Sequence, residues 1–261
     1  MIKKDSSNFV SGKFYYKGIP LEDGPEWGMT LRSAGSMRFR WNEENPVRDS
    51  FLASLSRGGY KIAAVELIHS RSVIDVHDVG KLSNIQADGM ITSDKTIIPV
   101  VTVADCMPIY LYDHVKKVFG MLHSGWKGTG IVREAIEIAS AIYGCDPEDF
   151  CVVMGPHIHS CCYRVNEERS SYFRVNFSPD CVHLLDAEKG DWCYSLSLAD
   201  ANLSILHSLG IPDSSILVSK DCTCCNPVFG SFRRETLGLP KNMSLEEKQK
   251  HFTVQAAWVK F

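Results

Sequence analysis

Three residues of the kinds that bind metals or attack substrates each close an apolar run of the sequence. His69 follows the run at 63–68, Cys106 follows the run at 99–105, and His123 lies near the end of the run at 117–125. Two imidazoles and one thiolate form a three-ligand set that suits zinc, and a fourth position left open to water is typical of a catalytic zinc site. A Cys–His pair can also act as nucleophile and base in acyl transfer. A lone cysteine or histidine beside an apolar run is also commonly a core residue, so the residues alone leave these interpretations open.

The runs that precede these residues predict β-strands. They are rich in β-branched and aromatic residues, and polar breaks separate 107–113 from 117–125. Reactive groups gather at strand ends because a rigid sheet fixes them while the adjoining loop leaves room for a ligand. We therefore expect three strand ends to present the candidate ligands.

A glycine-rich segment follows His123 and opens the strongest helix signal in the chain. The apolar residues of 131–143 recur at helical spacing, and Gly144 is placed to end the helix. Free backbone N–H groups at such a helix start, with Lys127 beside them, could hold a phosphate. The alternative is that the glycines of 125–130 only allow the helix to pack closely on the sheet.

Six segments in a fixed order identify a family resemblance that covers about Ala63 to Glu235. The segments are ADGMITSD, VTVADCMPIYLYD, HSGWKGTG, GPHIHSCCYRV, CTCCNP and SFRRE. They resemble the YfiH/laccase-domain family of purine nucleoside phosphorylases, also labelled polyphenol oxidases. The combination of ADC with HxGW[RK]G and CCY is specific enough to make chance a poor explanation.

The resemblance implies a zinc-dependent enzyme whose metal ligands are His69, Cys106 and His123. It implies cleavage of adenosine, inosine or S-methyl-5'-thioadenosine with phosphate to give the base and ribose 1-phosphate, with adenosine deamination as an additional activity. Zinc is the expected cofactor, with copper as the alternative. The expected catalytic residues are Cys106 and Asp105, the latter assisting the departing base.

Phosphate is expected to bind to Lys127 and to the two arginines of SFRRE, Arg233 and Arg234. The planar guanidinium group can grip phosphate through two parallel hydrogen bonds. Surface salt bridges are the alternative role for both arginines. Asp88, in ADGMITSD, is expected near the metal loops or as a turn residue that caps backbone amides.

The chain departs from the family pattern around the expected site. Leu67 and Ser70 stand where the family has Gln and Gly, the usual N-terminal Gly-Gly-Val-Ser is not kept, and the usual Gly-Arg before the last strand is missing. We therefore expect metal chemistry to be retained and substrate preference to differ. Three alternatives stay open: a cysteine amide hydrolase that uses Cys106 with His123 or His69, a copper-dependent polyphenol oxidase, and a zinc-stabilised binding module without activity.

The remaining cysteines carry no zinc-finger spacing. Cys161 and Cys162 are adjacent, and adjacent side chains of an extended backbone point in opposite directions, so we expect them to be packing residues. Cys222, Cys224 and Cys225 lie in a loop without a second cysteine pair nearby in sequence, so we expect ordinary thiols there.

Bulk properties predict a soluble globular protein. Strands with helices between them recur along a chain that no linker divides, which predicts one α/β domain over residues 1–261 with a mixed β-sheet flanked by helices. The resemblance makes it YfiH-like, similar to the CNF1/YfiH-type cysteine hydrolases. With 44% hydrophobic and 23% charged residues and a net charge of -3, the chain offers no basic surface for nucleic acid. No signal peptide or apolar run of membrane length is present, so we expect a cytoplasmic monomer or homodimer with reduced thiols that binds a purine nucleoside and phosphate.

Overall fold

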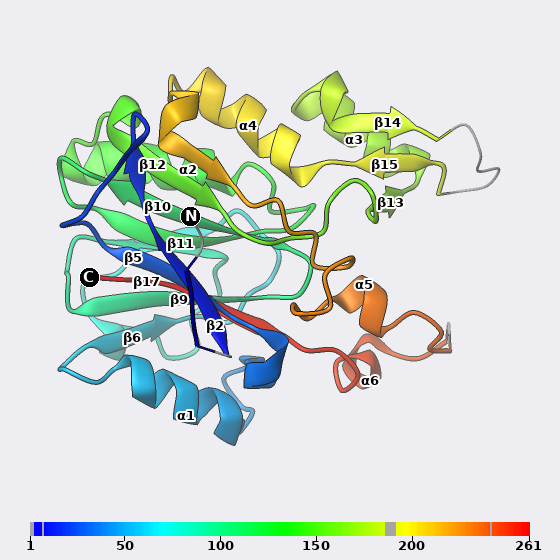
Figure 1. The fold of residues 1–261 in the computed structure, drawn as a ribbon, viewed down its shortest axis with the longest axis horizontal. Helices are drawn as coiled ribbons and strands as arrows, with labels where there is room; N and C mark the ends of the chain where they lie inside the picture. The colour runs from blue at the N-terminus through cyan, green and yellow to red at the C-terminus, as the bar shows by residue number, and fades with distance from the viewer. Residues whose placement is uncertain (1–2, 7, 186–191, 241) are drawn as a thin grey trace.

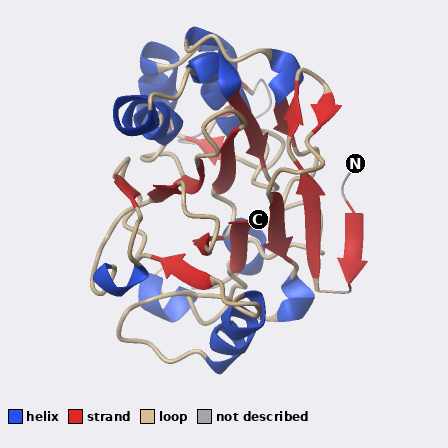
Figure 2. Cartoon of the chain, turned by 90° about the vertical axis from the view of Figure 1, so that its left-hand side faces the viewer, coloured by secondary structure: helices blue, strands red, loops and turns tan. Residues whose placement is uncertain are grey.

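Two mixed β-sheets packed face to face form the centre of the molecule (Figures 1 and 2). The computed structural model describes residues 3–6, 8–185, 192–240 and 242–261. The first sheet has the strand order β1 (Lys3–Ser6), β2 (Phe9–Lys13), β5 (Glu26–Thr30), β17 (Gln255–Lys260), β9 (Ile97–Val103) and β6 (Lys61–Ala64). The second has the order β16 (Ile216–Val218), β12 (Phe150–Met154), β10 (Met107–Asp113), β11 (Phe119–Ser124), β8 (Gly89–Thr92) and β7 (Val73–Asp75).

Smaller elements surround the two sheets. A third sheet has the order β13 (Arg164–Val165), β15 (Tyr194–Leu196) and β14 (Val182–Leu184), and β3 (Tyr15–Tyr16) pairs with β4 (Ile19–Pro20). The α-helices are α1 (Pro46–Leu55), α2 (Ile131–Tyr143), α3 (Glu167–Asn176), α4 (Leu198–Ser208), α5 (Phe232–Glu235) and α6 (Leu245–Lys248). Short 3-10 helices span Arg32–Ala34, Val79–Lys81, Pro147–Asp149, Pro179–Cys181 and Asp213–Ser215.

The residues of β10 show how the layers arise from the sequence. All seven are buried, and their side chains alternate between two hydrophobic cores. Ile109 and Leu111 pack toward α2 and α4, whereas Tyr110 and Tyr112 pack against the first sheet. A continuous apolar run is what a strand buried on both faces requires, because successive side chains point to opposite sides.

Helices cover the outer faces of both sheets. The apolar side chains of α2 and α4 belong to the core of the second sheet, and Phe51, Leu52 and Leu55 of α1 pack on the outer face of the first sheet (Figure 1). The fold is therefore a four-layer α/β/β/α arrangement. The predicted α/β class with mixed sheet and outer helices is confirmed, and the single sheet expected from sequence is divided into two.

The predicted helix after the glycine-rich segment is confirmed as α2. Gly130 and Gly144 flank it with φ values of 104° and 67°. Residues other than glycine adopt these backbone conformations only at a cost in free energy. Within the described part of the chain, no helix has the length and apolar content needed to span a membrane. All ten cysteines lie among the described residues and are free thiols.

Candidate metal centre and substrate pocket

His69, Cys106 and His123 meet at one edge of the stacked sheets. The parallel strands β6 and β9 end at the same edge, so the loops that carry His69 and Cys106 start side by side. The antiparallel partner of Met107 at the start of β10 is Ser124 of β11, which brings Cys106 beside His123. One ligand atom from each residue lies within 4.8 Å of the other two. The three segments converge as expected, but the predicted strand over 63–68 ends at Ala64, so His69 lies in the loop that follows β6 and not at the end of a strand.

Asp88 is a buried carboxylate that organises this cluster. Its Oδ1 accepts hydrogen bonds from Nδ1 of His123 at 2.8 Å and from the backbone N–H of His69 at 2.9 Å. Its Oδ2 accepts from the backbone N–H and the hydroxyl of Ser70, at 2.6 and 2.7 Å. Because Nδ1 of His123 is held by Asp88, the Nε2 atom of that ring is left for another ligand. Both expected roles of Asp88 occur together: it lies at the candidate site and it caps backbone amides.

Charge interactions in the cluster favour a thiolate. Burial alone would raise the pKa of the Cys106 thiol, but the adjacent His123 and His69 lower it to about 6. Burial lowers the pKa of His123, while Cys106 and Asp88 raise it well above the usual histidine range. The pKa of Asp88 lies below its ordinary value because hydrogen bonds from His123 and Ser70 outweigh its burial. The cluster is therefore a set of interacting charges in a partly enclosed place.

Two residues of the site have backbone conformations that are uncommon for residues other than glycine. The φ angle of His69 is 59° and that of Asp105 is 76°. Such conformations persist where surrounding contacts enforce them, and they cluster at functional sites. At His69 the enforcing contacts are the hydrogen bonds from residues 68–70 to Asp88.

The donor set fits a metal ion. A borderline-soft divalent ion such as zinc takes both imidazole nitrogen and thiolate sulfur, and a carboxylate hydrogen-bonded to a ligand histidine is its usual neighbour. Gly125 keeps the space beside the donors open: a Cβ atom at this position would lie 2.9 Å from Sγ of Cys106 and 3.5 Å from Cδ2 of His69. The same set can bind copper, so the residues define a metal site without fixing the metal.

A pocket of about 600 Å³ opens directly onto the three candidate ligands. Four arginines line it, namely Arg38, Arg40, Arg169 and Arg233, together with aromatic residues that include Phe39, Trp126, Tyr163 and Phe232. Only Arg233 was expected from the sequence. The sequence Arg-Phe-Arg-Trp at 38–41 alternates cationic and aromatic residues, and this alternation could have indicated Arg38 and Arg40 as binding residues. Arg169 lies on the polar helix α3, whose sequence gave no such indication.

The four arginines differ in how far they are already engaged. Arg40 pairs with Glu66 at 2.9 Å and Arg38 with Glu43 at 3.1 Å. Arg169 stacks 4.2 Å from the ring centroid of Trp126 and donates one hydrogen bond to the hydroxyl of Tyr163 at 3.3 Å, while its buried Nε has no hydrogen-bond partner among the described residues. Arg233 donates one hydrogen bond to the carbonyl of Arg164 at 3.3 Å. Arg169 and Arg233 therefore retain the most capacity to bind an anion in the pocket.

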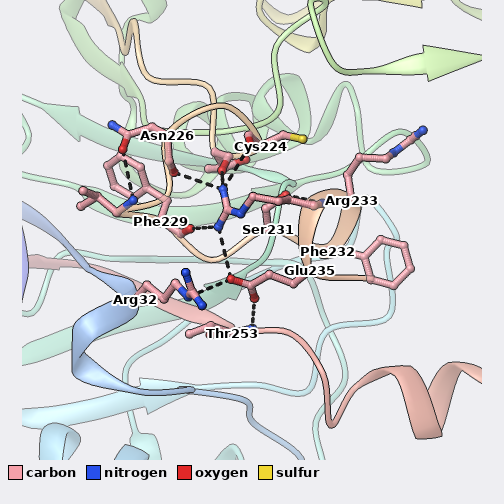
Figure 3. Close-up of polar contacts among 12 residues, drawn as sticks. Arg32, Cys224, Asn226, Phe229, Ser231, Phe232, Arg233, Glu235 and Thr253 are labelled. Carbon is pink, nitrogen blue, oxygen red and sulfur yellow. Dashed lines mark hydrogen bonds and ion pairs between the residues drawn. The ribbon is translucent and has the colours of Figure 1, made fainter. Parts of the chain in front are cut away.

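Arg233 and Arg234 are adjacent in sequence, but their side chains contact different parts of the protein. Figure 3 shows the Arg233 side chain extending away from the polar network that surrounds Glu235. Arg234 donates instead to the carbonyls of Thr223, Cys224, Asn226 and Phe229 and pairs with Glu235 at 3.2 Å. The guanidinium of Arg234 is thus engaged with backbone, while that of Arg233 faces the pocket.

Asp105 is bound to two neighbouring segments. Its Oδ1 accepts from the hydroxyl of Thr223 and its Oδ2 from the backbone N–H of Arg233, both at 2.6 Å. These bonds attach the start of α5 and the loop before it to the chain segment that carries Cys106. The contacts support a positioning role beside the expected catalytic one.

Lys127 is exposed, and its Nζ lies 5.4 Å from the ring centroid of Trp126 at the margin of the pocket. The glycines near it make close packing contacts: a Cβ atom at Gly128 would lie 2.8 Å from the carbonyl oxygen of Ser70. Close packing is therefore a sufficient reason for glycine at this position, and it leaves the phosphate role of Lys127 as a prediction.

Replacing Asp88 by Asn tests whether this carboxylate supports a metal site. Whichever way the amide is turned, its NH2 group faces an N–H donor that the carboxylate now satisfies. We expect Asp88→Asn to lower metal affinity by about 10–100-fold, the usual effect of losing such a neighbour. Affinity would be measured by chelator competition. Asp78→Asn, at an exposed turn where the carboxylate also accepts a backbone N–H, is the control. Wild-type affinity in Asp88→Asn would contradict this role.

Together, the fold and the site define a mixed α/β protein with a His–Cys–His candidate metal centre in an arginine-lined pocket. Residues 44–242 match the model of the family described as multi-copper polyphenol oxidoreductase laccase, and the chain belongs to this family. The YfiH/laccase-domain resemblance seen in the sequence is thereby confirmed.

Named relatives in this family are phosphorylases. The chain is 30% identical over 187 residues to "Purine nucleoside phosphorylase LACC1" from Mus musculus, covering 69% of this chain and 42% of that protein. It is 33% identical over 176 residues to "Purine nucleoside phosphorylase" from Borreliella burgdorferi, covering 67% of this chain and 74% of that protein. The chain thus matches less than half of the length of the mouse relative.

Solved structures share the whole fold. The hypothetical protein YfiH from Bacillus licheniformis superposes with a TM-score of 0.80 at 22% identity, over 100% of this chain and 98% of that chain. At this identity the likeness concerns the fold.

Proposed function

We propose that this protein is a metal-dependent purine nucleoside phosphorylase. The observation that carries the proposal is the pocket itself, in which a His–Cys–His donor set and arginine guanidinium groups line one cavity with aromatic walls. A phosphorolytic enzyme must hold phosphate beside the glycosidic bond, and this pocket offers cationic groups for phosphate and rings for a base. The names of the relatives agree with this assignment.

In this proposal His69, Cys106 and His123 hold zinc, which supplies Lewis acidity to the substrate when bound. Arg169 and Arg233 bind phosphate and orient one of its oxygens toward C1' of the nucleoside. The glycosidic C–N bond breaks and a C–O bond to phosphate forms. The base leaves with its bonding electrons and takes up the proton that hydrogen phosphate loses. Asp105 keeps the backbone of Arg233 in place and stays the candidate for assisting the departing base, and Lys127 adds positive charge at the margin of the pocket.

A second candidate function has an observation of its own. Cys106, His123 and Asp88 lie in the order of a nucleophile, a base and an orienting carboxylate, which is the arrangement of a cysteine hydrolase. A thiolate that holds a metal is not free to attack a carbonyl. Metal content therefore separates the two candidates, and the family relatives favour the phosphorylase.

Product analysis tests the proposal. Protein purified without added metal is incubated with adenosine, inosine or methylthioadenosine in phosphate buffer, and the products are separated by chromatography. We expect the free base together with ribose 1-phosphate or its methylthio analogue, and no base release when an inert buffer replaces phosphate. Deaminated base would reveal the additional adenosine deaminase activity.

Three results would count against the proposal. Release of free ribose instead of the phosphate ester would indicate hydrolysis. Turnover of a phenol or an amide without base release from any of the three nucleosides would indicate the polyphenol oxidase or the cysteine hydrolase. Full activity of a protein verified to be metal-free would show that the reaction does not require a metal ion.

A further inference from the structure

A second cluster of potential metal ligands lies outside the pocket. Sγ atoms of four cysteines lie within 4.8 Å of one another, namely Cys161, Cys162, Cys222 and Cys225. The separations are 3.8 Å for Cys161–Cys162, 3.6 Å for Cys161–Cys225 and 3.3 Å for Cys162–Cys225. The expectation that the side chains of Cys161 and Cys162 point in opposite directions is therefore wrong, because both thiols belong to one cluster.

The sequence did not reveal this cluster for two physical reasons. Cys161 and Cys162 lie in a turn, where the backbone N–H groups of Cys162 and Tyr163 both donate to the carbonyl of His159, and adjacent side chains of a turn need not diverge. The second cysteine pair exists but is 63 residues away in sequence.

Parallel pairing of two strands brings these pairs together. Met154 of β12 lies opposite Val218 of β16, so the segments that leave the two strands run side by side. A bridge joins His157 to Cys222, and the N–H of His159 donates to Sγ of Cys222 at 3.4 Å. The fold thus places a Cys-x-x-Cys turn against a Cys-Cys turn.

We propose that these four cysteines bind one zinc ion as a structural site. Four thiolates at about 2.3 Å from a tetrahedral zinc ion stand about 3.8 Å apart. The separations of 3.8, 3.6 and 3.3 Å in the cluster lie at or somewhat below this value. A cluster of several iron atoms would hold its thiolates further apart than a single ion does. Closed coordination by four cysteine thiolates is the arrangement of structural rather than catalytic zinc.

The position of the cluster suggests what a bound zinc ion would stabilise. Thr223, between Cys222 and Cys225, donates its hydroxyl to Asp105, and Arg234 donates to the carbonyls of Thr223 and Cys224. Asp105 in turn accepts from the backbone N–H of Arg233. Zinc at the four thiolates would fix the loop on which the positions of Asp105 and Arg233 depend. The site is therefore a support for the pocket, and it does not depend on which reaction the pocket performs.

Metal analysis of a variant without the first site tests this inference. In a Cys106→Ser background, protein purified without added metal should retain about one tightly bound zinc ion per chain. X-ray absorption at the zinc edge should show four sulfur ligands at about 2.3 Å. Adding Cys222→Ser and Cys225→Ser should remove this zinc. Adding Cys224→Ser, a change in the same loop but outside the cluster, should leave it bound.

Several outcomes would overturn the inference. These are a folded Cys106→Ser protein without zinc after purification, zinc bound through nitrogen or oxygen, zinc retained after loss of Cys222 and Cys225, and zinc lost in the Cys224→Ser control. A disulfide between cluster cysteines, found by mass spectrometry after alkylation without reductant, would show a redox pair instead. Because the absorption measurement uses only the Cys106→Ser protein, it decides the question even when the triple variant does not fold. If Cys106→Ser itself does not fold, the wild type is compared by native mass spectrometry with a Cys222→Ser, Cys225→Ser protein that keeps Cys106. Loss of one zinc ion per chain supports the site, and equal zinc contents contradict it.

Discussion

The Cys106→Ala variant is expected to bind one metal ion fewer per chain than the wild type and to lose nucleoside phosphorolysis. The thiolate is the only sulfur donor of the set formed with His69 and His123, and its loss removes one of three ligands. Loss of a residue that is hydrogen-bonded to a metal ligand lowers metal affinity or activity by about 10–100-fold. We therefore expect loss of the ligand itself to lower them by more than about 100-fold. Elemental analysis and base release from adenosine would measure both effects.

Cys151→Ala is the matched control for this experiment. Cys151 is a fully buried thiol of β12 that packs in the core between the sheets, away from the metal donors. Its replacement removes a comparable side chain and should keep both the metal content and the activity. A folded Cys106→Ala protein with wild-type metal content would refute the ligand assignment. Retained metal with abolished amide hydrolysis would instead favour the cysteine hydrolase.

Arg234→Ala is expected to lower the free energy of unfolding by about 3 kcal/mol or more. The guanidinium donates to four backbone carbonyls and pairs with Glu235, which itself accepts from the backbone N–H of Thr253 and pairs with Arg32 (Figure 3). Hydrogen bonds of a charged group contribute about 1.5–3 kcal/mol each, and they are not additive. Losing several at once leaves carbonyls of the cysteine loop without a donor. Chemical denaturation would measure the change.

Arg233→Ala is the control, with the opposite pattern of effects. Among the described residues its side chain makes one hydrogen bond, at 3.3 Å, so stability should fall by less than in Arg234→Ala. The phosphate concentration for half-maximal activity should rise by about 10–100-fold, the equivalent of about 1.5–3 kcal/mol for a charged hydrogen bond. Equal loss of stability in both variants would contradict the division of roles. An unchanged phosphate requirement in Arg233→Ala would exclude this residue from the phosphate site.

Local patterns in the sequence were sufficient to predict the strands beside two of the three candidate metal ligands, whereas the strand predicted before His69 ends early, at Ala64. Apolar runs rich in β-branched residues predicted the strands beside Cys106 and His123, because a strand buried on both faces needs such residues at every position. Helical spacing and a terminal glycine predicted α2 for the same kind of local reason. The family resemblance added the expectation that the three residues already singled out by strand-end reasoning are metal ligands.

The tertiary structure alone decided which distant residues share a site. Pairing of β6 with β9 and of β10 with β11 determines that His69 reaches Cys106 and His123, and pairing of β12 with β16 determines that two cysteine pairs form one cluster. Strand pairing depends on packing across the whole core, so no local pattern encodes it. For the same reason, the sequence did not separate Arg233 from Arg234: the two differ in the surroundings that α5 gives them, one facing the pocket and one facing the carbonyls of a loop.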